Sequence, residues 1–447
     1  MKEKHIFSNK ELWALLIPVM VEQLLTSLMG TVDTIMVSNV GSEAISAVSL
    51  VDAINVLVIQ AFAALAAGGT IICSQYLGRT DKKNAENAAS QVVLSTVVLS
   101  LLVTMVCLAV RTPLLRLIFG AVEPEVMRNS EIYFFYTALS FPFIALFNSG
   151  SAIFRAQKNT RTPMTISVTS NFMNIGGNAF LIWGMHMGVA GAAIATLASR
   201  VFCAVMVMYC LRKPRYELTV RDYRRIRPDW SCIRRVLSVG IPSGVENSMF
   251  QFGKLAIQST VSTLGTVAIA AQAMTNILEG LNGICVMGVG MGMMTVVGQC
   301  IGAGREDEAV YYIKKLSVWS EFIMIANCLV VFAATKPITI LGGMEAESAR
   351  MCFEMMLAIT IYKPIAWVCS FVPAYGMRAA GDVKFSMIVT CVSMWLCRVS
   401  LAVVLCRFTD IGPMGVWVAM FTDWTVRGFI FLYRFHSRKW LRHRVIE

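Results

Sequence analysis

The sequence predicts an all-α polytopic membrane protein of twelve transmembrane helices, arranged as two parallel six-helix repeats. Of its 447 residues, 56% are hydrophobic and only 15% are charged. Apolar stretches long enough to cross a bilayer, for which about 20 residues suffice, recur along the whole chain. The second half also repeats motifs of the first half in the same order. A composition of this kind excludes an ordinary soluble enzyme.

The apolar stretches and the basic residues together predict the topology. Clusters of Lys and Arg follow every second apolar stretch, which is the positive-inside pattern and predicts a cell inner (plasma) membrane protein with both termini cytoplasmic. The twelve predicted spans are 12–38, 44–77, 85–110, 131–154, 163–184, 189–211, 233–262, 267–300, 309–334, 349–377, 384–406 and 413–435.

The internal repeat is visible in short motifs. IPVMVEQ (17–23) reappears as IPSGVEN (241–247), and QYLG (75–78) reappears as QCIG (299–302) in the same register. Arg155-Ala156 matches Arg378-Ala379 after a slip of one residue. Because each repeat has an even number of spans, the two share one orientation, as in many transporters. The predicted parts are an N-lobe (1–210), a basic cytoplasmic linker (211–232), a C-lobe (233–435) and a basic cytoplasmic tail (436–447).

Other features exclude several functions. The 13 cysteines and four histidines form no zinc motif or disulfide framework, so we expect no metal centre of that kind. The net charge of +12 lies in the tails, the linker and alternate loops, so it reflects topology and not nucleic-acid binding. For the linker we expect a solvated tether.

The first span carries polar residues that are unusual in a bilayer helix. Pro18 frees the carbonyl of Ala14 and predicts a hinge. Glu22 and Asp33 are about three turns apart and therefore lie on one side of the helix. Ionisable groups inside a span usually face a bundle interior or a watery cavity. The alternative is that these groups only lock helix packing.

The fifth span places three asparagines on one helix face, Asn171, Asn174 and Asn178. The three corresponding positions in the second half are not amides: Met394, Cys397 and Leu401. The position that matches Asp33 is the apolar Ile257. This asymmetry predicts a polar N-lobe pocket formed by Asp33 and the asparagines. The alternative is that the asparagines hydrogen-bond neighbouring helices.

The second half has its own polar face. Span seven carries the hinge candidate Pro242 with Glu246 and Gln251, and span eight carries Gln272, Asn276 and Glu279 at helical spacing. If the two spans form an antiparallel hairpin, Lys254 pairs with Glu279, because an unpaired charge there is costly. Three further basic residues inside spans are expected to form structural pairs or to reach the interface: Arg200, Lys363 and Arg398.

Taken together, these motifs resemble the multidrug and toxic compound extrusion (MATE) family over essentially the whole chain. The resemblance implies two lobes in a V shape that export organic cations in exchange for protons or sodium ions. It implies Pro18 as a hinge, Asp33 as the coupling carboxylate and Asn174 as its neighbour. Asn178 stands where some members of the family have a carboxylate. Phe250 stands where other members have the carboxylate of the C-lobe. Glu246 lies one turn before Phe250, so the role of the C-lobe carboxylate is assigned to it only by analogy.

The sequence therefore predicts a secondary exporter of drug-like, often cationic amphiphilic molecules. A lipid-linked oligosaccharide flippase and, more distantly, an intramembrane hydrolase are the alternatives. We expect a monomer that is not an enzyme. Its expected partners are small-molecule substrates and membrane lipids, without nucleic acid. No cofactor is expected besides H+ or Na+, and a bound Na+ would lie near Asp33 or Glu246. Predicted ion-coupling residues are Glu22, Asp33, Asn174, Asn178 and Glu246. Predicted substrate contacts are Asp33, Asn171, Asn174, Gln251, Gln272, Asn276 and Glu279.

Overall fold

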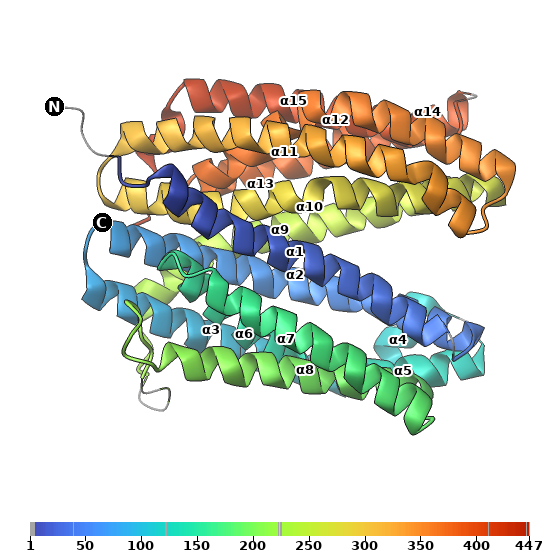
Figure 1. The fold of residues 1–447 in the computed structure, drawn as a ribbon, viewed down its shortest axis with the longest axis horizontal. Helices are drawn as coiled ribbons and strands as arrows, with labels where there is room; N and C mark the ends of the chain where they lie inside the picture. The colour runs from blue at the N-terminus through green and yellow to red at the C-terminus, as the bar shows by residue number, and fades with distance from the viewer. Residues whose placement is uncertain are drawn as a thin grey trace. The chain divides into compact units, whose positions relative to one another are not determined.

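The computed structural model describes residues 5–38, 40–120, 123–221, 223, 226–409, 411–443 and 445–446, without the side chains of residues 29, 31, 33, 34, 38, 42 and 119. All regular structure in these residues is helical (Figure 1). The first half contains α1 (Asn9–Ser38), α2 (Ser42–Gly78), α3 (Lys82–Ala109), α4 (Arg111–Phe119), α5 (Pro124–Leu139), α6 (Phe141–Ala156), α7 (Arg161–Asn178), the π-helical η1 (Ala179–Gly184) and α8 (Gly188–Leu211).

The second half follows a similar order. It contains α9 (Trp230–Val261), the 3-10 turn η3 (Ser262–Leu264), α10 (Thr266–Gly302), α11 (Glu306–Leu341), α12 (Ala346–Ala380), α13 (Val383–Ser393), the π-helical η4 (Met394–Ser400), α14 (Leu401–Phe408), α15 (Met414–His436) and the 3-10 turn η5 (Lys439–Arg442). In both halves the fifth predicted span includes a π-helical turn.

Each predicted span coincides with one helix or with a run of consecutive helices, which confirms the fold class. Within the described part of the chain, eight helices are long and apolar enough to cross a membrane, and α5 with α6 would make a ninth. The remaining predicted spans coincide with α7–η1, α9 and α15. These three fall short because of polar residues such as Asn174, Lys254 and Asp423.

The fourth predicted span is bent, which the sequence analysis did not anticipate. The axes of α5 and α6 differ by 41° across Ser140. Pro142 lies in the first turn of α6, where its missing N–H removes no helical hydrogen bond. A new helix can therefore begin at this point in a different direction.

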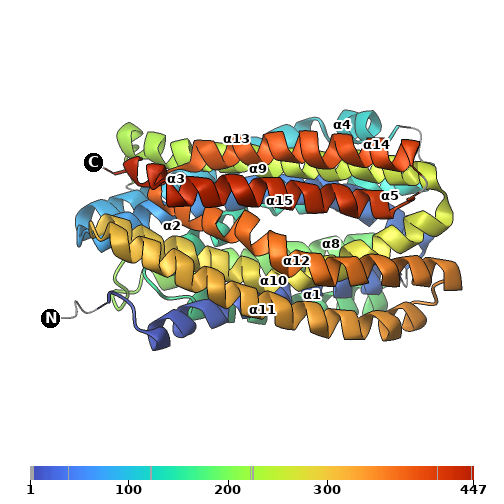
Figure 2. The same cartoon turned by 90° about the horizontal axis from the view of Figure 1, so that it is seen from above.

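The chain divides into two compact units, the N-unit (Trp13–Gly244) and the C-unit (Val245–Glu447 with Met1–Leu12). In the N-unit, α2 packs against α3 and α6, and α7 packs against α8; in the C-unit, α10, α11 and α12 pack on one another and α12 also packs on α15. Within each unit, most helices run roughly parallel or antiparallel to one another (Figures 1 and 2). The unit boundaries fall inside α1 and α9, and the lobe and linker boundaries given above stay a prediction.

The segment that precedes each proline-bearing helix is anchored on a helix of the other half of the chain. Before α1, Phe7 and Tyr312 of α11 exchange two hydrogen bonds, each 2.9 Å long. Before α9, Asp229 accepts a 2.8 Å hydrogen bond from Asn87 of α3, and its N–H donates to Gln91. Because Asn87 and backbone N–H groups at the start of α9 donate to it, the pKa of the Asp229 carboxyl lies below its usual range.

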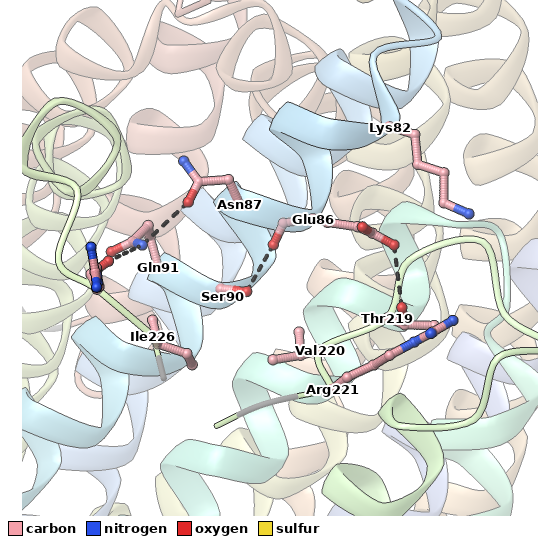
Figure 3. Close-up of a pocket in the computed structure, with 10 residues that line it drawn as sticks. Lys82, Glu86, Asn87, Ser90, Gln91, Thr219, Val220, Arg221 and Ile226 are labelled. Carbon is pink, nitrogen blue, oxygen red and sulfur yellow. Dashed lines mark hydrogen bonds between the residues drawn. The ribbon is translucent and has the colours of Figure 1, made fainter. Parts of the chain in front are cut away.

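The predicted linker packs within the N-unit and is not the solvated tether that we expected. Leu218 and Val220 are 0% and 2% exposed, and Thr219 donates to Glu86 of α3. Figure 3 shows this segment and α3 lining a largely polar cavity of about 760 Å³. The buried apolar residues hold the linker against the rest of the N-unit, because their burial removes apolar surface from water.

We predict that Gly240→Ala destabilises the N-unit, because a Cβ on Gly240 of α9 would lie 3.1 Å from the Leu65 Cα of α2. Overpacking of this kind costs about 1–3 kcal/mol. Gly176→Ala is the matched control, since a Cβ there meets nothing within 4 Å. In thermal unfolding of purified protein, Gly240→Ala should lower the midpoint while Gly176→Ala leaves it unchanged or raises it. Equal midpoints for the two variants would contradict the close helix contact.

Candidate functional site

A buried ion pair fastens α1 inside the N-unit. Glu22, four residues after the buried Pro18, is 4% exposed, and its Oε1 lies 3.9 Å from Nη2 of Arg155 on α6. An ionised carboxylate inside a membrane-spanning bundle is costly unless a cation compensates it. Arg155 supplies that compensation.

The C-unit contains the matching pair. Glu246 on α9, four residues after the buried Pro242, is 6% exposed, and Nη2 of Arg378 on α12 donates a 2.5 Å hydrogen bond to its Oε1. Arg155 and Arg378 are the arginines of the repeated Arg-Ala motif. Sequence reasoning identified Glu22 and Glu246 as equivalent but missed their partners, although the repeat register already matched both members of each pair.

The remaining predicted residues of α1 are described only in part. Pro18 and Pro242 both lie inside continuous helices, and their role as hinges stays a prediction. The backbone of Asp33 belongs to α1, but its side chain lies outside the described part of the structure. The predicted contact between Asp33 and the asparagines is therefore neither confirmed nor contradicted.

The asparagine face of α7 lies partly against α8. Asn174 and Asn178 are 6% and 1% exposed, and Asn178 Nδ2 donates to Asn174 Oδ1 over 3.2 Å. Asn174 Nδ2 lies 3.4 Å from Oγ1 of Thr196 on α8. Asn171 is half-buried. Interhelical hydrogen bonding is therefore part of the role of Asn174, as the second interpretation of this face anticipated.

The polar face of α10 divides into a buried and an exposed part. Gln272 is 2% exposed, accepts a 3.0 Å hydrogen bond from the indole of Trp417, and donates to Asn276. Asn276 is exposed, and Gln251 on α9 is half-buried. Gln272 is thus engaged with α15, whereas Asn276 and Gln251 remain on or near the surface of the C-unit.

The predicted pairing of Lys254 with Glu279 is wrong. Nζ of Lys363 on α12 lies 2.5 Å from Glu279 Oε1 and donates a 2.8 Å hydrogen bond to the Glu279 carbonyl oxygen. Lys254 is exposed, with Nζ 5.0 Å from the Phe250 ring centroid. Lys363 is 1% exposed and needs a buried anion, whereas an exposed lysine does not. The prediction considered only the neighbour in sequence, although α10 also packs on α12.

A second buried charge group lies on α15 and η4. Oδ2 of Asp423 is 2.5 Å from Nη2 of Arg427 and 3.4 Å from Nε of Arg398, and Ser393 also donates to Asp423. Arg398 thus forms a structural pair, as expected. Sequence reasoning missed Asp423 and Arg427, although opposite charges four residues apart within a span were the available signal.

The expected Na+ site near Asp33 or Glu246 stays a prediction. No group of three or more His, Cys, Asp or Glu side chains that could hold a metal ion is found among them. The Glu246 carboxylate is bound to a guanidinium, which would repel a sodium ion at the same position.

We predict that Lys363→Met lowers the free energy of unfolding by about 3 kcal/mol, because it leaves the Glu279 carboxylate without its cation. Lys254→Met, which breaks no ion pair among the described residues, should change it by less than about 0.5 kcal/mol. Chemical or thermal unfolding of both purified variants measures the difference. If Lys254→Met proves the more destabilising variant, the observed assignment of the Glu279 partner is wrong.

Comparisons with known proteins agree with this architecture. The MatE family model matches residues 18–180 and 242–404, one match in each repeat. A probable multidrug resistance protein NorM of Thermotoga maritima is 26% identical over 98% of this chain and 94% of its own. An uncharacterized transporter YisQ of Bacillus subtilis is 26% identical over 96% and 95%.

A solved structure has the same fold. The outward-facing conformation of a multidrug resistance MATE family transporter aligns with a TM-score of 0.87 over 96% of this chain and 95% of that chain, at 21% identity. Both repeats, the twelve-helix order and the sequence matches therefore lead to one conclusion. The chain belongs to the MatE family of membrane transporters.

Proposed function

We propose that this protein is a secondary active exporter that moves drug-like molecules out of the cell in exchange for protons or sodium ions. The observation that carries the proposal is the family match in both repeats, together with relatives described as multidrug resistance proteins that align over nearly the whole chain. In this proposal the two units alternate between inward-open and outward-open arrangements. The protein lies in the inner membrane with both termini in the cytoplasm.

Asp33 is the proposed coupling carboxylate. Glu22 and Glu246 each face an arginine, so their negative charges are already compensated inside the protein. Asp33 has no carboxylate counterpart in the second half, where Ile257 stands. A group that binds and releases the coupling ion should be specific to one half, whereas the paired glutamates are common to both.

The proposed mechanism depends on a change at α1. Loss or gain of a proton or sodium ion at Asp33 changes which groups its carboxyl can hydrogen-bond. The side-chain amides of Asn174 and Asn178 on α7 are the proposed hydrogen-bond partners. Pro18, whose ring removes one helical hydrogen bond, allows α1 to bend in response. Coupling requires that the ion and the substrate favour different conformations.

For substrate contacts we retain the polar residues of both units. Asp33, Asn171 and Asn174 suit cationic amphiphiles in the N-unit, and the exposed Asn276 and half-buried Gln251 offer amides in the C-unit. Gln272 and Glu279 do not contact the substrate directly in this proposal. Gln272 already accepts a hydrogen bond from Trp417, and Glu279 is already ion-paired with Lys363. The protein acts as a monomer among membrane lipids and uses no cofactor besides the coupling ion.

One observation favours the flippase as a second candidate. Basic residues outnumber acidic ones among the charged residues of the C-unit spans, and a pyrophosphate lipid would need such an excess. The family match and the multidrug relatives favour the exporter.

We predict that Asp33→Asn strongly reduces ion-driven export while substrate binding remains. Removing the titratable group removes a coupling free energy of about 1–3 kcal/mol, so the gradient-driven rate should fall by about 5–150-fold. The measurement is ethidium transport by proteoliposomes under an imposed proton or sodium gradient, with ethidium binding measured in parallel. Asp33→Glu keeps a titratable group and should retain coupling.

Asp52→Asn is the matched control, because Asp52 is another carboxylate of the N-unit, hydrogen-bonded by Asn55. It should leave the coupling ratio unchanged. If Asp33→Asn exports ethidium at the wild-type rate under the same gradient, Asp33 is structural and the proposed coupling is wrong.

A further inference from the structure

We propose that the C-unit contains a binding site for an organic monoanion, and that Lys254 is the residue that holds its negative charge. The inference deepens the proposed export function and rests on it for its physiological meaning. It starts from a group of charged residues on membrane-spanning helices, here called the basic cluster: Lys254, Glu279, Lys363, Arg398, Asp423 and Arg427.

The basic cluster has two more positive than negative charges. Lys363 neutralises Glu279 at 2.5 Å. Asp423 is shared by two arginines, Arg427 at 2.5 Å and Arg398 at 3.4 Å. Within the described part of the chain, no carboxylate lies within ion-pair distance of Lys254, so Lys254 is the cation of the cluster that can accept a new anion.

The members of the cluster are close enough to act on one another. Nζ of Lys254 lies 5.0 Å and Cζ of Arg398 lies 5.2 Å from the centroid of the same Phe250 ring. Lys254 and Arg398 both interact electrostatically with Glu279. The ring contributes cation–π attraction but no negative charge, so the excess positive charge remains.

Other carboxylates of the unit do not supply the missing charge. Glu246 is held by Arg378. Among the described residues, no ion pair joins Glu321 on α11 to Lys254. Charged groups within membrane-spanning segments often mark substrate or ion pathways, and Lys254 is such a group.

The position of Lys254 suits a ligand. It is exposed, as is Gln258 on the next turn of α9, whose amide can donate a hydrogen bond. Lys363 and Arg398, at 1% and 2% exposure, are buried and already paired. A ligand can therefore bind at Lys254 without breaking an existing ion pair.

The chemistry limits the ligand class. One accessible cation matches one negative charge, and the half-buried Phe250 ring beside it offers an apolar face. An amphipathic carboxylate or sulfonate fits these features, whereas a pyrophosphate would call for several accessible cations. The first half has Gly30 at the position that matches Lys254, so the site belongs to the C-unit only.

The test uses ligands that share one fluorophore and differ in charge. Binding of dansylglycine, its neutral methyl ester and the cationic dansylcadaverine to the purified full chain in detergent is followed by fluorescence. Wild type should bind dansylglycine more tightly than the ester by about tenfold, the range of a charge-assisted contact. Lys254→Gln should remove most of that preference, and Lys254→Arg should keep it.

Lys336→Gln is the matched control. Lys336 lies on α11 of the same unit, with Nζ 5.1 Å from the Phe353 ring, but belongs to no ion pair of the cluster. It should bind dansylglycine like wild type. Unfolding midpoints of all variants verify that they are folded.

Three results would overturn the inference. The first is equal binding of dansylglycine and its ester by wild type, and the second is an unchanged preference in Lys254→Gln. The third is displacement of dansylglycine by a polyprenyl pyrophosphate at much lower concentrations than by a free carboxylate, which would identify a lipid headgroup site. Binding needs no gradient, so a failure of ethidium export would count against the proposed function and leave this result unaffected.

Discussion

The Glu22–Arg155 and Glu246–Arg378 ion pairs hold the two proline-bearing helices, α1 and α9, to α6 and α12. A carboxylate buried inside a helix bundle is not hydrated, so it must find a cation within the protein. That constraint decides which helices must be neighbours in each unit. It also explains why both members of each pair recur in the repeat: loss of the arginine would leave a buried carboxylate without its compensating cation.

The two halves share this framework and differ in what they add to it. Both anchor the segment before the proline-bearing helix on the first turns of a long helix, through Tyr312 in one case and Asn87 in the other. The first half adds asparagines on α7, and the second half adds the basic cluster. The shared contacts therefore serve the fold, and the residues specific to one half are the candidates for recognising ions and substrates.

Much of the fold could be predicted from the sequence, because span length, positive-inside charge and a repeat in register are each set by the bilayer or by the chain itself. Contacts between distant helices were less accessible. The partner of Glu279 is Lys363, which belongs to a helix distant in sequence, and hairpin reasoning could not identify it. The linker was expected to be solvated because it is rich in arginine, yet Leu218 and Val220 anchor it to the N-unit. By contrast, the partners of Glu22 and Glu246 could have been found by following the Arg-Ala motif through the repeat.

The most direct test of this account is a double-mutant cycle on each ion pair, with the free energy of unfolding measured for the single and double variants. The cycles are Glu246→Gln with Arg378→Met, and Glu22→Gln with Arg155→Met. The account predicts a coupling energy above about 1 kcal/mol in both cycles, since the arginine change in each cycle leaves a buried carboxylate without its cation. It also predicts the larger value for Glu246–Arg378, whose atoms are 2.5 Å apart against 3.9 Å. Strictly additive effects in both cycles would contradict the claim that these pairs hold α1 and α9 in place.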